Sequence, residues 1–338
     1  MKQIVVQEAE AGQRLDKLLS RYLKEAPKSF LYKMLRKKNI TLNGRKADGS
    51  EKVEKNDEIR IFLADETYEK FAGKTDRNPS GYPTARLDIL YEDEHILLIN
   101  KPAGMLTQKA KASDVSLNEY MLGYLERESR KSGEQKEASE DPVRTNYAFR
   151  PSICNRLDRN TSGIVICGKS VAGLRKMSEL LRDRTMHKYY QCLVAGQVTE
   201  PQNIRGYLKK DPVSNKVTIQ AEESEGAALI ETEYRPLSVF ADSTLLEVRL
   251  ITGRPHQIRA HLASQGHPII GDYKYGYRRI NEVYKKRYGL TGQLLHAGRL
   301  TMPALEAPFE ALSGRCFEAA LPPLMATIIQ KERKTGEM

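Results

Sequence analysis

An acidic residue that stands between two arginines is the feature of this sequence best suited to chemistry. Asp158 follows Arg156 and Leu157, precedes Arg159, and leads into a Thr-Ser-Gly turn at 161–163. Two neighbouring cations favour the ionised carboxylate. Residues 164–167 are a short apolar run typical of a buried strand, which would hold the preceding loop rigidly, as a nucleophile or base requires. By itself the Arg-Leu-Asp-Arg tetrapeptide is more often an ordinary surface ion pair, so its context has to decide.

Other kinds of catalytic or metal site find little support. His256, His261 and His267 are five and six residues apart, and no cysteine or acid completes a ligand set of familiar spacing. The sequence contains no Gly-x-Ser-x-Gly nucleophile elbow, Gly-x-Gly-x-x-Gly or Walker pattern. We therefore expect neither a metal nor a cofactor.

Length, charge and cysteine content indicate the class of protein. The 338 residues favour two domains, and the net charge of +11 with a pI near 9.3 favours a polyanionic partner. Residues 1–64 hold fifteen Lys and Arg against nine Asp and Glu, an excess of six positive charges. Four widely spaced cysteines predict reduced thiols, and no apolar stretch approaches the length of a membrane span. We expect a soluble cytoplasmic protein that does not bind membranes.

Residues 1–64 have the pattern of a small αβ domain. A helix over 15–23 is predicted from its apolar spacing, and a second helix is predicted to be capped by Ser29 and to run through Lys38. A strand at 40–42, an Asn-Gly turn and a strand at 59–63 follow. This arrangement resembles the S4 RNA-binding domain. On the second helix the cations Lys33, Arg36 and Lys37 share a face that is either solvated or, as the resemblance implies, bound to RNA.

The remaining chain divides into three parts. Residues 65–83 mix charges with Gly and Pro and are interpreted as a linker. Residues 84–325 form the predicted catalytic domain, which begins with paired strands at 87–91 and 96–100. Residues 326–338 are interpreted as a C-terminal tail.

Ordered motifs across residues 84–325 resemble one enzyme family. They are YEDEHILLINKPAG at 91–104, NRLDRNTSGIVICGK at 155–169, KYY at 188–190, LITGRPHQIRAHL at 250–262 and GHPIIGD at 266–272. Together they resemble the RluA-type pseudouridine synthases, from whose central signature only Asn155 departs, in place of a His. The resemblance implies an α+β fold in which a mixed, mainly antiparallel sheet carries the active site.

The resemblance also implies the reaction and the residues that perform it. A pseudouridine synthase isomerises uridine in RNA without a cofactor, and Asp158 matches the family's catalytic carboxylate. Arg259 matches its permanent cation, and Tyr190 matches the aromatic residue that stacks on the flipped uracil. Arg156 and Arg159 are expected to orient the loop and contact phosphate.

His256 is expected to donate or accept a hydrogen bond or to face phosphate. Family members with an S4-like domain mostly act on ribosomal RNA, so structured large-subunit ribosomal RNA is the expected partner of a protein that we expect to act as a monomer. A synthase acting on transfer RNA, and a non-catalytic RNA-binding or ribosome-assembly factor on the same scaffold, remain the alternatives.

Overall fold

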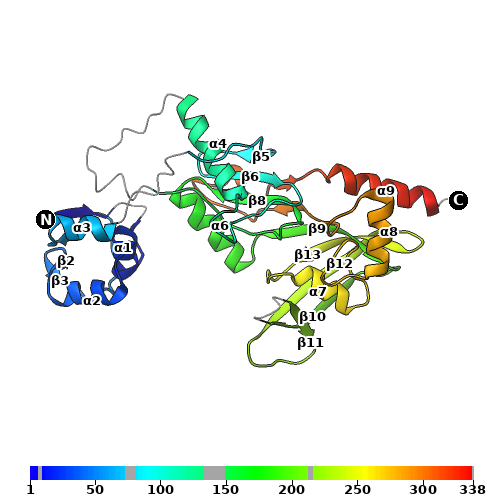
Figure 1. Ribbon diagram of the computed structural model, residues 1–338, viewed down its shortest axis with the longest axis horizontal. Coiled ribbons are helices and arrows are strands. Elements are labelled where there is room, and N and C mark those ends of the chain that lie inside the picture. The colour runs from blue at the N-terminus through cyan, green and yellow to red at the C-terminus, as the bar shows by residue number, and fades with distance from the viewer. Residues whose placement is uncertain (7–9, 73–80, 132–148, 212–215, 337–338) are drawn as a thin grey trace. The chain divides into compact units, whose positions relative to one another are not determined.

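The computed structural model describes residues 1–6, 10–72, 81–131, 149–211 and 216–336. Two compact units are present, one formed by Met1–Tyr82 with Gly123–Arg150, the other by Pro83–Leu122 with Pro151–Met338. Figure 1 shows the elements of both units in chain order by colour.

The first unit is built around a small antiparallel sheet with strand order β1-β4-β2-β3. Its elements are β1 (Lys2–Val5), α1 (Leu15–Tyr22), α2 (Lys28–Arg36), β2 (Ile40–Leu42), β3 (Arg45–Lys46), β4 (Glu58–Ile61) and α3 (Asp65–Ala72). Leu15, Leu18 and Leu19 of α1 share one core with Leu31 and Leu35 of α2. The predicted helices, strands and turn of this domain are therefore present.

Two local details of this unit are informative. Helix α2 begins at Lys28 with Pro27 at its N-cap position, so the prediction that Ser29 caps it is wrong. Proline suits a helix start because it has no N–H that would be left without a partner there. Asn43 and Gly44 have φ values of 50° and 71°, as a two-residue turn between strands requires.

The predicted linker at 65–83 is wrong over its first part. Residues 65–72 form helix α3, with Asp65 and Glu66 in the first turn, where acids are favourable. Tyr68 and Ala72 are buried in the core of the first unit, and the Phe71 ring lies 4.4 Å from that of Phe30. Residues 73–80 of the predicted linker lie outside the described residues.

The second unit contains an 11-stranded sheet. The strand order is β11-β10-β12-β13-β9-β14-β8-β6-β5, with β15 paired to β14 and β7 paired to β8. Of these pairs β14 and β8 are parallel and the others antiparallel, which confirms the predicted mixed, mainly antiparallel sheet. The strands are β5 (Ile89–Glu92), β6 (Ile96–Lys101), β7 (Ser152–Ile153), β8 (Ser162–Gly168), β9 (His187–Ala195), β10 (Gln202–Lys210), β11 (Val217–Gln220), β12 (Ala227–Val239), β13 (Ser243–Leu250), β14 (Leu295–Thr301) and β15 (Cys316–Glu318).

The helices of this part of the chain include one where a tail was predicted. They are α4 (Leu117–Lys131), α6 (Val171–Asp183), α7 (Gln257–Ser264), α8 (Arg278–Tyr288) and α9 (Pro323–Gly336). Met325, Ile328 and Ile329 of α9 are buried in a core that also includes Tyr284 of α8, and Figure 1 shows the two helices side by side. The prediction of a tail at 326–338 is therefore wrong, because three apolar residues at helical spacing attach the segment to the domain. Within the described residues, no helix is both long and apolar enough to span a membrane.

Candidate active site

Asp158 lies on the loop that leads into β8, a strand whose seven residues are all buried. The preceding residue, Leu157, donates its backbone N–H to the hydroxyl of Thr107 at 3.2 Å, and the same hydroxyl donates to the Leu157 carbonyl at 2.7 Å. The Thr161 N–H donates to the Asp158 carbonyl at 3.0 Å. The backbone on both sides of the carboxylate is thus fixed by hydrogen bonds, as a reacting group requires.

Glycine is required where this loop enters the sheet. Gly163 has φ of 111°, and a Cβ atom there would overlap the backbone of Ala297. Ala297 is its partner in the parallel pairing of β8 with β14. The Thr-Ser-Gly turn therefore allows two backbones to approach closely directly behind the Asp158 loop.

A buried lysine is hydrogen-bonded to the loop that carries Asp158. The Lys101 side chain is completely buried, and its ammonium group donates to the carbonyls of Pro102 at 2.9 Å, Met105 at 2.9 Å and Arg159 at 3.1 Å. Burial lowers the pKa of Lys101 to about 8, against the opposing influence of the Asp158 charge. This ammonium group ties the loop after β6 to the loop that carries Asp158.

Arg259, on α7, links two carboxylates. Its Nη1 donates to Oδ2 of Asp158 at 2.7 Å, while Nε and Nη2 donate to the two carboxylate oxygens of Asp272 at 2.7 and 2.9 Å. Arg259 is 8% exposed and Asp272 is 1% exposed. Burial opposes both charges, but the hydrogen bonds and the opposite charges around each group together outweigh it, so the pKa of Arg259 is raised and that of Asp272 is lowered. The guanidinium is therefore held by Asp272 with one N–H group directed at Asp158.

His256 immediately precedes α7 and has a left-handed backbone conformation, with φ of 57°. Its Nδ1 is hydrogen-bonded to the hydroxyl of Tyr275 at 2.9 Å, and its Nε2 lies 4.0 Å from Oδ2 of Asp158. Burial lowers the pKa of His256, and the charge of Arg259 lowers it further, against the influence of Asp158. The neutral imidazole, which can both donate and accept hydrogen bonds, is thus favoured beside the carboxylate.

Tyr190, on β9, is 6% exposed and pairs with Val248 of β13. Burial and the nearby Asp158 charge both raise the pKa of its hydroxyl, which keeps the phenol neutral. Tyr190 lines the same cavity of about 1030 Å³ as Asp158. The cavity walls also include the other residues predicted for substrate binding, namely Arg156, Arg159, His256 and Arg259.

The comparisons with known proteins agree with this geometry. A family described as RNA pseudouridylate synthase matches residues 95–264, and the S4 domain matches residues 13–59. The chain belongs to the RNA pseudouridylate synthase family. It is therefore an enzyme, an RNA pseudouridine synthase with an S4 domain, and the predicted family and N-terminal domain type are confirmed.

The synthase has curated relatives along almost its whole length. It is 32% identical to "Ribosomal large subunit pseudouridine synthase C" of Vibrio vulnificus over 320 residues, which cover 90% of both chains. The protein of that name from Escherichia coli is 31% identical over 94% of this chain and 96% of its own. The solved structure of human RNA Pseudouridylate Synthase Domain Containing 4 has a TM-score of 0.55 and 21% identity, over 72% of this chain and 92% of that one, and it supports the fold.

The cations predicted near Asp158 differ in their positions: Arg259 contacts the carboxylate, and the two flanking arginines do not. The cation in contact with Asp158 is Arg259, 101 residues away in sequence. Arg156 and Arg159 are exposed, and Nε of Arg159 donates to the carbonyl of Gly104 at 3.0 Å. The two flanking arginines therefore belong to the rim of the cavity, where phosphate contact stays a prediction.

Further cations around the cavity were missed by the sequence reasoning. Lys109, Arg182, Arg184, Lys188 and Arg254 also line it. Burial lowers the pKa of Lys188, and the charge of Arg184 lowers it further. These residues come from four separate segments, so only the fold brings them together. A rim of this kind suits the backbone of a polyanion.

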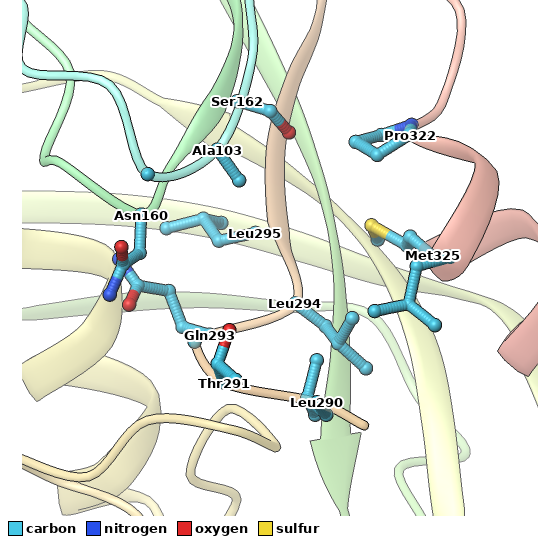
Figure 2. A pocket seen from close by; sticks show the side chains of 13 residues that line it. Ala103, Asn160, Ser162, Leu290, Thr291, Gln293, Leu294, Leu295, Pro322 and Met325 are labelled. Atoms are coloured by element: carbon cyan, nitrogen blue, oxygen red, sulfur yellow. The ribbon is translucent and has the colours of Figure 1, made fainter. Parts of the chain in front are cut away.

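A smaller cavity of about 160 Å³ lies behind the Asp158 loop. Figure 2 shows Asn160 and Gln293 at one end of this cavity and Pro322 and Met325 at the other. The Gln293 side-chain amide donates to the hydroxyl of Thr161 at 3.2 Å. The cavity thus lies where the segment before β14 and the start of α9 meet the residues that follow Asp158.

The three predicted RNA-binding cations of the S4 domain lie in the first unit. Lys33, Arg36 and Lys37 are exposed on or directly after α2, whose other face buries Leu31 and Leu35. The amphipathic arrangement of the helix is therefore as predicted. Binding of RNA by these residues stays a prediction.

Proposed function

We propose that this synthase converts specific uridines of large-subunit ribosomal RNA to pseudouridine, with Asp158 as the catalytic carboxylate. The observation that carries the proposal is the ion pair between Asp158 and Arg259 at 2.7 Å, on the wall of a cavity that is rimmed by cations. The reaction breaks the N1–C1′ bond of uridine and forms a C5–C1′ bond. N1 gains a proton and C5 loses one, so neither an oxidant nor a reductant is needed.

An ionised Asp158 can act by either of two routes. It can attack the anomeric carbon, or it can remove the 2′ proton to give a glycal, and both routes need the charged form. Arg259 stays protonated at any working pH, so it supplies a permanent positive charge beside the carboxylate when RNA excludes water from the cavity. Asp272 acts as a positioning residue because it holds the other two donors of the guanidinium.

The remaining residues of the cavity are assigned to the substrate. The Tyr190 ring would stack on the uracil base after it leaves the RNA helix, as aromatic side chains do with unpaired bases. His256, as a neutral imidazole, would form a hydrogen bond with the flipped nucleotide. Arg156 and Arg159, which are exposed at the rim, would contact the neighbouring phosphates.

The names of the relatives support ribosomal RNA as the substrate. Relatives that align over 90% or more of this chain are called ribosomal large subunit pseudouridine synthase C. The S4 domain adds a second RNA-binding unit, which a large structured RNA can engage. Transfer RNA is the alternative substrate, and the intact Asp158–Arg259–Asp272 arrangement argues against a non-catalytic assembly factor.

Pseudouridine mapping in cells tests the proposal. Ribosomal and transfer RNA from cells that lack the protein would be compared with RNA from cells complemented by the wild type or by Asp158→Asn. We expect specific large-subunit sites to lose pseudouridine and to regain it with the wild type alone. Loss confined to transfer RNA would assign the alternative substrate, and full restoration by Asp158→Asn would remove that residue from catalysis.

A further inference from the structure

A short segment after the active-site residue Asp272 concentrates positive charge. Residues 273–288 contain six Lys and Arg and a single acid, Glu282. Their excess of five charges, added to the excess of six in residues 1–64, equals the whole net charge of +11, so the rest of the chain is neutral overall. The same segment holds five of the seventeen tyrosines. Clustered cations with aromatic residues are typical of surfaces that bind nucleic acid.

The cations of α8 are free to bind a partner. Arg278, Arg279, Lys285 and Lys286 are all exposed, and none of them forms an ion pair with any residue that the structure describes. Tyr273 and Tyr277, which precede the helix, are 49% and 50% exposed. We call these six residues the α8 surface.

On two other helices, cations form ion pairs with acids of the same helix. On α4, Arg130 pairs with Glu126 at 2.7 Å and Lys131 pairs with Glu128 at 2.8 Å. On α6, Lys176 pairs with Glu179 at 3.2 Å. On these helices an acid three or four residues from a cation pairs with it, whereas Glu282 of α8 lies at that spacing from all four cations and pairs with none of them among the described residues.

The α8 surface is rigidly connected to the catalytic residues. Asn281, 1% exposed, accepts a hydrogen bond from the backbone N–H of Gly271 at 2.7 Å and donates to the carbonyl of Asp272 at 2.9 Å. Tyr284 is buried in the core that α8 shares with α9. Because Asp272 also holds Arg259, the helix has a fixed position relative to the cavity.

We propose that the α8 surface binds the RNA backbone next to the target uridine, with Tyr273 and Tyr277 available to stack on unpaired bases. The inference rests on the proposed function, because the RNA that the α8 surface binds is taken to be the substrate of the synthase. Four exposed cations without ion-pair partners can each contact a phosphate group, while Asn281 and Tyr284, buried on the same helix, hold α8 in place. Glu282, the acid on the same helix, would repel phosphate groups and so weaken the binding of RNA by the α8 surface.

The test compares the salt dependence of RNA binding. The full chain with Arg278, Arg279, Lys285 and Lys286 replaced by Gln would be titrated with unmodified large-subunit ribosomal RNA at 50 and 200 mM salt. Losing four phosphate contacts should reduce the log–log salt slope of RNA binding by about 3. Over this fourfold change in salt, the affinity of the wild type should therefore fall roughly 60-fold more than that of the variant. Glutamine preserves helix propensity, and circular dichroism would establish that the variant is folded.

A matched control variant removes four positive charges from helices other than α8. Replacing Arg130, Lys131, Arg175 and Lys176 by Gln on α4 and α6 should leave the salt slope close to that of the wild type. If the control lowers the slope as much as the α8 variant, net charge alone explains the effect and the proposal fails.

A single substitution in the opposite direction keeps the proposal testable if the fourfold variant does not fold. Glu282→Gln removes the acid from the helix and should tighten RNA binding about two- to threefold at low salt, in line with the strength of an exposed charge interaction. Unchanged binding in both variants would overturn the proposal. If the proposed function were wrong instead, the wild type itself would form no pseudouridine in this RNA. The two failures can therefore be told apart.

Discussion

Replacing Asp272 by Asn tests whether a buried charge positions Arg259. The Asp272 side chain is completely buried and accepts two hydrogen bonds from Arg259, together with the backbone N–H groups of Lys274 at 2.9 Å and Tyr275 at 3.2 Å. Asparagine keeps the size but loses the charge, and its NH₂ group would face the guanidinium donors. The substitution therefore breaks a buried ion pair without leaving a cavity.

The structure indicates the size of the effect. Removing one partner of a buried ion pair costs about 3–5 kcal/mol in the free energy of unfolding. Since Arg259 keeps its contact with Asp158, we expect the lower end, about 3 kcal/mol. At about 2–4 °C per kcal/mol for a domain of this size, the melting temperature should fall by roughly 6–12 °C. The loss of orientation should lower the single-turnover rate about 100-fold.

The pH dependence has a defined sign. Burial raises the pKa of Asp272, but the hydrogen bonds and charge of Arg259 and the backbone N–H groups of Lys274 and Tyr275 together outweigh it, so this pKa is lowered in the folded protein. Its contribution to stability is therefore fully present above the unfolded pKa of about 4 and is lost as the pH falls through the folded pKa. The difference in unfolding free energy between wild type and Asp272→Asn should be constant from pH 6 to 8 and shrink below about pH 4.

Urea unfolding and single-turnover pseudouridine formation are the assays. Glu126→Gln, which breaks the exposed pair with Arg130, serves as the control and should cost less than about 1 kcal/mol. If Asp272→Asn unfolds like the wild type and reacts at the same rate, Asp272 does not position Arg259 and the reasoning is wrong.

Three further variants probe other parts of the molecule. Arg259→Lys keeps the charge but cannot bridge Asp158 and Asp272, so its single-turnover rate should fall at least tenfold, and a wild-type rate would refute the pairing. Lys101→Met removes one donor from each of three carbonyls, of which that of Arg159 keeps the N–H of Gly104, and should lower the unfolding free energy by about 2–3 kcal/mol, measured by urea unfolding. Joint replacement of Lys33, Arg36 and Lys37 by Gln should reduce the log–log salt slope of RNA binding by about 2–3 units, and an unchanged slope would mean that this face does not contact RNA.

Much of the fold and of the site could be predicted from the sequence because local patterns carry it. The buried strand after Asp158 and the helix of the S4 domain over 15–23 follow from their apolar periodicity. Asp158, Arg259 and Tyr190 were predicted from motifs, and the structure brings all three to one cavity.

The remainder depends on contacts that sequence neighbours do not reveal. Arg156 and Arg159 flank Asp158 in sequence, yet the loop directs them to the rim, and the cation that contacts Asp158 is Arg259 of a distant helix, which was predicted from its motif and not from sequence proximity. Lys101 and Asp272 lie within recognised motifs, but only tertiary packing shows that they hold the loop and Arg259.

Two short charged segments were misassigned for a related reason. Helix α3 buries a few apolar side chains among charged ones, and α9 buries a few before a charged run at 331–334, so their composition resembles that of a linker or a tail. In both segments the only local signal is a set of apolar residues at helical spacing: Tyr68, Phe71 and Ala72 in α3, and Met325, Ile328 and Ile329 in α9.

The most direct test of the central claim is pseudouridine formation in purified, unmodified large-subunit ribosomal RNA by the wild type and by Asp158→Asn, with RNA affinity measured in the same samples. The proposal assigns affinity mainly to phosphate contacts and the chemistry to one carboxylate, so the variant should bind RNA with near-wild-type affinity and form no pseudouridine. Product formation by Asp158→Asn above a mock-purified control would contradict the account.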